Sequence, residues 1–105
     1  MPTNKILAEM LPAASDTVLM YYDLAGNGAQ GNLFFVNQSS NADKVRVAVT
    51  PKDVPPNPDS YLLYDTVVPP NHTVVLQEIG LAVYERLYVF SQNGTTSFVY
   101  TGQAY

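Results

Sequence analysis

The chain has 105 residues, of which 47% are hydrophobic and only 13% are charged, and its formal net charge is −4. This length suits a single domain, and the few basic residues are scattered, so no basic stripe is available to bind nucleic acid. The chain has no cysteine and no run of about 20 apolar residues, so we expect neither disulfides nor a membrane-spanning helix. The N-terminal residues also lack the apolar core of a secretory signal, and we expect the protein to be made and kept in a cytoplasm until assembly or lysis.

Residues 1–16 differ from the rest of the chain and are interpreted as an N-terminal arm. Four apolar residues in it have helical spacing: Ile6, Leu7, Met10 and Leu11. Pro2 and Pro12 bound them, which allows one or two turns of helix or an extended arm. An apolar arm needs a surface to cover it, either on its own domain or on a neighbouring subunit or larger shell.

Residues 17–105 are predicted to form an all-β domain. Seven strands are expected: Thr17–Tyr22, Asn32–Val36, Val45–Thr50, Tyr61–Asp65, Thr73–Gln77, Leu87–Ser91 and Ser97–Thr101. Short strands at this regular spacing favour a two-sheet antiparallel β-sandwich, with a small barrel as the alternative.

The alternation and the turns give further detail. Val45, Val47 and Val49 are expected to face the core and Lys44, Arg46 and Ala48 to face water. The turns at Pro69-Pro70-Asn71 and Asn93-Gly94, the latter as a type I′ hairpin, predict a β-meander over residues 61–100. Residues 51–60, PKDVPPNPDS, contain four of the eight prolines and are interpreted as a stiff connection between sheets.

No pattern of catalytic, cofactor-binding or metal-binding residues is recognisable. His72 is the only histidine and stands in a predicted turn, and no serine has the surroundings of a nucleophile. Asp53 and Asp59 offer at most an adventitious cation site. Gly26-Asn27-Gly28 leads into a strand, whereas phosphate loops lead into a helix, so it is interpreted as a turn. These observations predict a protein that is not an enzyme.

The chain contains eight tyrosines and no tryptophan. Tyrosine combines an apolar ring with a polar tip, which suits a half-buried sheet face or an oligomer interface. Four tyrosines in or beside predicted strands are the candidates for that interface: Tyr21, Tyr64, Tyr88 and Tyr100. Stacking on sugars is the functional alternative.

Two long segments, LFFVNQSSNADKVRVAV and YLLYDTVVPPNHTVVLQEIGLAVYERLYVFSQNGTTSFVYTG, carry a resemblance that covers about residues 33–102. They resemble small β-sandwich virion proteins of tailed bacteriophages, including cyanobacterial phages. The shared outline is a strand ending in Asn, a short Ser-rich loop, an RVAV-like strand, a Y-x-x-Y-D strand, a Pro-Asn turn, an Ile-Gly-Leu-like step and a closing hairpin ending in Tyr-Gly or Phe-Gly. This chain departs from the outline in its proline-rich loop and at Thr101.

The resemblance implies a virion component without enzymatic activity or cofactor, on the outer capsid surface after assembly in the host cytoplasm. The implied partners are the major capsid protein and further copies of the chain, as a homotrimer, with no nucleic acid or membrane. As a capsid cement or decoration protein, it would dock through Ile6, Leu7, Met10 and Leu11. The alternative is a tail, collar or fibre module that contacts host-surface glycans through the loop Asn37–Asn41 and the proline-rich loop.

Overall fold

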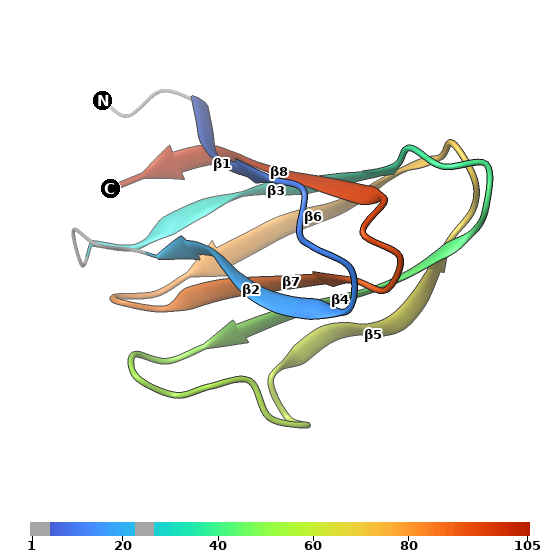
Figure 1. Ribbon diagram of the computed structural model, residues 1–105. Helices are drawn as coiled ribbons and strands as arrows, with labels where there is room; N and C mark the ends of the chain where they lie inside the picture. Colours follow the sequence, from blue (N-terminus) through green and yellow to red (C-terminus); the bar gives the residue numbers. More distant parts are fainter. Residues whose placement is uncertain (1–4, 23–26) are drawn as a thin grey trace.

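The computed structural model describes residues 5–22 and 27–105, and these form eight β-strands (Figure 1). The strands are β1 (Lys5–Met10), β2 (Asp16–Tyr22), β3 (Ala29–Asn37), β4 (Asp43–Thr50), β5 (Tyr61–Val68), β6 (Thr73–Leu81), β7 (Arg86–Ser91) and β8 (Thr96–Ala104). Within these residues no helix is long and apolar enough to cross a membrane. Gly26 of the predicted Gly26-Asn27-Gly28 turn lies outside the described residues.

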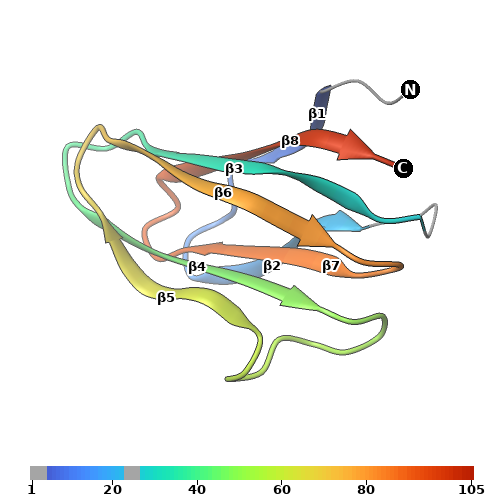
Figure 2. The same cartoon turned by 180° about the vertical axis from the view of Figure 1, so that it is seen from behind.

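The strands form two four-stranded antiparallel sheets packed face to face (Figures 1 and 2). One sheet has the order β1-β8-β3-β6 and the other β2-β7-β4-β5. The predicted two-sheet sandwich is therefore confirmed, with eight strands in place of about seven.

The connections differ from the predicted meander. Among the eight strands of the described residues, β4 and β5 are the only consecutive ones that pair. Residues 51–60, predicted to pass between sheets, join these two strands within one sheet. The turns at residues 69–72 and 92–95 instead cross from one sheet to the other. A type I′ turn needs positive φ at both central residues, but only Gly94 has it, at 71°. Asn93 instead donates its backbone N–H to Asp43 Oδ1 at 2.9 Å and its side-chain amide to Ala42 O at 3.0 Å.

The predicted arm supplies the first strand of the sandwich. Residues 5–10 pair with β8, from Lys5 opposite Gly102 to Met10 opposite Phe98, and a β-bulge lies between Ile6 and Ala8. In a regular strand, Leu7 and Met10 would face opposite sides, because side chains alternate. The bulge at Leu7 lets both pack against the core, which explains why their spacing resembled that of a helix. Within the described residues, the part of the predicted arm from Lys5 to Met10 therefore belongs to the sandwich.

The core lies between the sheets and comes from alternate positions of the strands. Its fully buried apolar side chains are Leu33, Phe35, Val45, Val47, Val68, Leu87, Val89, Phe98 and Tyr100. Phe35 of β3 and Phe98 of β8 stand opposite each other in register, with ring centroids 5.5 Å apart. Full burial of an aromatic or branched side chain stabilises the fold by roughly 1.5–3 kcal/mol.

Two buried polar side chains fix the end of the sandwich where the turns at 38–42, 69–72 and 92–95 meet. Asn37 is fully buried at the end of β3, and its amide donates to Asn41 O at 2.8 Å and to Val68 O at 3.2 Å. Its Oδ1 accepts from the backbone N–H of Ser39 and the hydroxyl of Thr95. Asn37 is therefore a structural anchor, and the prediction of a glycan-contacting loop from Asn37 to Asn41 is wrong for this residue.

Asp43 plays the matching role at the start of β4. Its carboxylate accepts hydrogen bonds from the hydroxyls of Ser91 and Thr96, and from the backbone N–H groups of Lys44 and Asn93. Burial alone would raise the pKa of Asp43, but these donors, Ser91 first, outweigh burial and leave the pKa below its ordinary value. A charged, fully bonded carboxylate thus joins β4, β7 and β8.

Candidate binding surface

The four tyrosines predicted to form an interface separate into two pairs. Tyr100 is 0% exposed, and its hydroxyl donates to Ile79 O at 2.7 Å. Burial, with smaller contributions from Tyr21 and Tyr105, raises the pKa of Tyr100 far above the usual value. Tyr21 packs against the core with its ring centroid 5.5 Å from that of Tyr100. The interface prediction is therefore wrong for Tyr100, and Tyr21 is half-buried beside it.

Tyr64 and Tyr88 lie on the outer side of the sheet β2-β7-β4-β5. The strand registers bring more aromatic residues to the same side: Tyr88 lies opposite Ala48, and Ala48 opposite Tyr61. Phe90 lies opposite Arg46, and Tyr22 opposite Arg86. We call this surface the tyrosine face, defined by Tyr22, Tyr61, Tyr64, Tyr88, Phe90, Arg46 and Arg86. Three of its aromatic residues lie against its two guanidinium groups.

Arg46 is held between two aromatic rings and a carboxylate at one end of the tyrosine face. Its guanidinium carbon lies 4.2 Å from the ring centroid of Tyr64 and 4.4 Å from that of Phe90, and Nε donates to Asp65 Oδ1 at 2.7 Å. The bulge in β5 brings this about, because Asp65 adopts a φ of 52° and both Tyr64 and Asp65 reach the same arginine. The hydrogen bond raises the pKa of Arg46 and lowers that of Asp65.

Arg86 is held in a similar way at the other end of the face. Its guanidinium carbon lies 4.1 Å from the ring centroid of Tyr22, and Nη1 donates to Tyr84 O at 3.2 Å. Asp53 is a looser partner, with Oδ1 3.8 Å from Nη2. Cation–π contacts of this kind are worth about 0.5–1 kcal/mol each at exposed sites, so both guanidinium groups are positioned in advance of any partner.

The tyrosine face also corrects the predicted wet side of β4. Ala48 points outward in register with Tyr61 and Tyr88, yet it is only 1% exposed. Thr50 lies opposite Arg86 and is fully buried as well. Alternation had assigned Ala48 to solvent, but its neighbours on this side of the sheet are aromatic residues, and the neighbour of Thr50 is an arginine. The alternation of β4 thus correctly predicted that Ala48 points outward. It did not predict the aromatic residues of neighbouring strands that lie beside Ala48.

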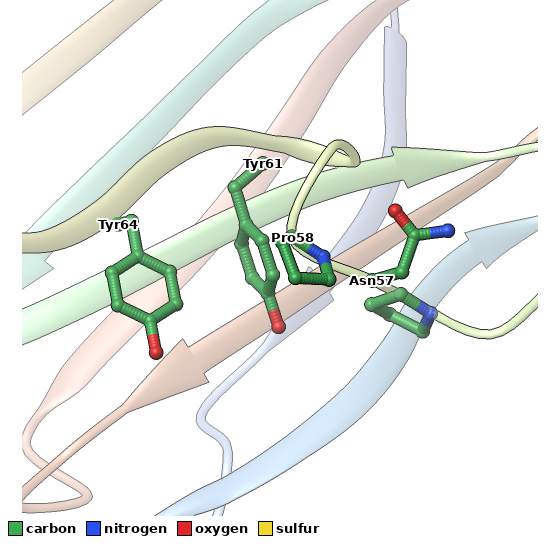
Figure 3. Close-up of a pocket in the computed structure, with 5 residues that line it drawn as sticks. Asn57, Pro58, Tyr61 and Tyr64 are labelled. Atoms are coloured by element: carbon green, nitrogen blue, oxygen red, sulfur yellow. The ribbon is translucent and has the colours of Figure 1, made fainter.

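A hollow of about 470 Å³ lies next to the tyrosine face, where the proline-rich loop meets β5 (Figure 3). Its lining consists of Pro56, Asn57, Pro58, Tyr61 and Tyr64. The rings of Tyr61 and Tyr64 meet edge to face with centroids 4.9 Å apart. In Figure 3 both hydroxyls point the same way, and Pro58 stands beside Tyr61. This volume is within the usual range of small-ligand sites, roughly 300–1,000 Å³.

Of the four residues predicted to dock on a capsid, two are packed inside the sandwich and two are exposed. Leu7 and Met10 pack against the core of their own sandwich. Ile6 is 59% exposed and Leu11 is 56% exposed. β1 buries the first pair because its bulge turns Leu7 inward, so only Ile6 and Leu11 remain available to a partner.

The described residues contain no cluster of three or more His, Asp, Glu or Cys side chains able to hold a metal ion. His72 is exposed in the 69–72 turn, with Nδ1 2.7 Å from Pro70 O. Asp53 is paired loosely with Arg86, as described above. Asp43 and Ser91 are hydrogen-bonded to each other and almost completely buried. The tyrosine face presents rings, guanidinium groups and hydroxyls.

Sequence reasoning missed Arg46 and Arg86 as surface-defining residues. The sequence did contain a signal, because each arginine is two residues away from other residues of the same strand that face the same side of the sheet. Their stacking partners, however, come from other strands and could not be paired without the sheet order. Comparison with models of protein families, with curated proteins and with solved structures gave no match for this chain.

Proposed function

We propose that the chain is a structural protein of a tailed-bacteriophage virion, a cement or decoration protein that binds the outer capsid surface and stabilises the head. The observation that carries this proposal is the tyrosine face, which gathers four of the eight tyrosines and both arginines of the chain. Cores of protein–protein interfaces are enriched in aromatic residues and arginine and depleted in lysine and glutamate. The resemblance of residues 33–102 to phage β-sandwich proteins supplies the biological setting.

The proposed mechanism is mechanical. Copies of the chain associate through the tyrosine face as a homotrimer, and Ile6 and Leu11 contact the major capsid protein. Each trimer then attaches to the lattice at several points, and linked attachment raises the overall strength far above that of one contact. The preset guanidinium groups and rings lose little conformational freedom on binding, which favours such an interface.

Quantitative mass spectrometry of purified virions tests the proposal. The expected result is a copy number that is a simple ratio to the major capsid protein. A handful of copies per particle would instead favour the tail, collar or fibre alternative, with host-surface glycans as the partner. Absence from the particle would overturn the virion proposal.

The docking residues are tested with a double substitution, Ile6→Ser with Leu11→Ser. This leaves the paired strand β1 in place, whereas truncation would uncover β8. We expect capsid binding to weaken about tenfold, as for the loss of a well-packed apolar contact. Val75→Ser is the matched control, since Val75 is an exposed apolar residue on β6, at the opposite edge of the same sheet. Equal binding by both variants would contradict the assignment.

A further inference from the structure

We propose that the hollow lined by Pro56, Asn57, Pro58, Tyr61 and Tyr64 binds an extended, proline-rich segment of another protein. The hollow shares Tyr61 and Tyr64 with the tyrosine face, so a proline-rich segment and a further copy of the chain would compete for these two rings. The binding chemistry does not depend on where the protein resides in a particle, so the inference is tested without the virion proposal. Three features carry it: the row of ring surfaces, the hydrogen-bonding groups left open, and the rigidity of the loop.

The ring surfaces match a polyproline II segment. Figure 3 shows Tyr64, Tyr61 and Pro58 side by side in a row, with Asn57 beyond Pro58. Proline-rich segments bind in grooves lined by aromatic side chains, where their pyrrolidine rings pack between the aromatic rings. Such segments are already extended before binding, so they lose little conformational entropy. The edge-to-face pair of Tyr61 and Tyr64 supplies one continuous aromatic surface of this kind.

The open polar groups favour a ligand rich in acceptors. Asn57 Oδ1 already accepts the backbone N–H of Asp59 at 2.9 Å, which leaves the Asn57 amide N–H groups as donors. The hydroxyls of Tyr61 and Tyr64 have no hydrogen-bond partner among the described residues, and each is able to donate. A polyproline II segment exposes its carbonyl oxygens and, at each proline, has no N–H to satisfy. The donors of the hollow therefore complement its backbone.

The same groups disfavour a sugar. A sugar presents many hydroxyl donors, and these need acceptors such as carboxylate or amide oxygens. The lining includes no carboxylate, and the backbone N–H of Asp59 already occupies one of the two lone pairs of its one side-chain amide oxygen. No charged group lines the hollow either, so an ionic ligand has no counter-charge there.

The loop is fixed before any ligand arrives. Ser60 N–H donates to Asn57 O at 2.9 Å, and Asn57 N–H donates to Ser60 Oγ at 3.2 Å. Val49 N–H donates to Ser60 O at 3.1 Å, which ties the loop to β4. On the other side, the Arg46 guanidinium stacks on Tyr64. A preformed groove of this kind avoids the cost of ordering a loop on binding.

The test is a titration of the purified full-length protein with fluorescein-labelled decaproline, followed by fluorescence anisotropy. A glycine–serine peptide of equal length carries the same label as a negative control, and unlabelled maltohexaose serves as a competing sugar. We expect saturable binding of decaproline, no binding of the glycine–serine peptide and no displacement by maltohexaose.

Variants locate the site. Tyr64→Ala is expected to weaken decaproline binding about tenfold, equivalent to about 1.4 kcal/mol. Tyr61→Phe and Tyr64→Phe keep the rings and remove the donors, so each should weaken binding by a smaller factor. Tyr105→Ala is the matched control, because Tyr105 is exposed and does not line the hollow. The affinity of this variant for decaproline should equal that of the wild type. Thermal unfolding of each variant confirms that it is folded.

Three results would overturn the proposal. They are the absence of saturable decaproline binding by the folded wild type, equal affinity of the wild type and Tyr64→Ala, and displacement of decaproline by maltohexaose. The last would assign the hollow to a carbohydrate.

Discussion

The two ends of the sandwich use polar side chains in opposite ways. At the end where the 38–42, 69–72 and 92–95 turns meet, Asn37 and Asp43 are buried and fully engaged in hydrogen bonds within the chain. At the other end, Tyr61, Tyr64 and Asn57 surround a hollow with donors that no described residue accepts from. A buried polar group must be satisfied internally, whereas an exposed, unsatisfied one is free to bind a partner. The first end specifies the fold, and the second is suited to recognition.

Among substitutions that test this difference between the two ends, the largest loss of stability is expected at Asp43. Asp43→Ala would leave the hydroxyls of Ser91 and Thr96 buried without their acceptor, and we expect a loss of about 3 kcal/mol or more in the free energy of unfolding. Urea denaturation measures it. Asp59→Ala is the control, because Asp59 is an exposed loop carboxylate, and its midpoint should stay near that of the wild type. Equal midpoints for both variants would contradict the anchoring role.

The same carboxylate predicts how stability depends on pH. The folded state lowers the pKa of Asp43, so the unfolded chain binds this proton more readily than the folded protein. The stabilisation is therefore complete above the unfolded pKa of about 3.9 and is lost as pH falls through the lower folded pKa. Urea midpoints measured from about pH 6 down to about pH 2 should fall less steeply in Asp43→Asn than in the wild type. Parallel pH profiles would be inconsistent with a lowered pKa.

A smaller difference in stability is expected between the substitutions of a buried tyrosine and of an exposed one. Tyr100→Phe removes the buried hydrogen bond to Ile79 O and should lower the free energy of unfolding by about 1 kcal/mol. Tyr64→Phe removes a hydroxyl with no partner among the described residues, so its effect on stability should be within about 0.5 kcal/mol of zero. Thermal or urea unfolding of the two variants side by side tests this. A larger loss for Tyr64→Phe would reverse the proposed division between core and surface.

The sequence predicted most strands, because alternation and turn residues are local signals. It did not predict the sheet order. Asn93-Gly94 is compatible with a hairpin, and only contacts distant in sequence, from Asn93 to Asp43 and Ala42, direct the chain into the other sheet. The spacing of Leu7 and Met10 matched a helix because a single bulge produces the same inward pair in a strand.

The candidate surface was predicted only in part, for the same physical reason. Tyr64 and Tyr100 are equivalent as sequence signals, both being strand tyrosines between polar and apolar neighbours. Which one is buried depends on the register of β8 and on the bulge in β5. Arg46 and Phe90 become neighbours only when β4 pairs with β7. Composition therefore indicated an aromatic interface without locating it.

The central claim is that the tyrosine face is the surface that partners cover, and hydroxyl-radical footprinting of the isolated protein and of intact virions tests it most directly. Tyr22, Tyr61, Tyr64 and Tyr88 are predicted to become protected in the particle, while buried Tyr100 should label weakly in both states. Equal labelling of the four outer tyrosines in the free and particle-bound protein would contradict the claim.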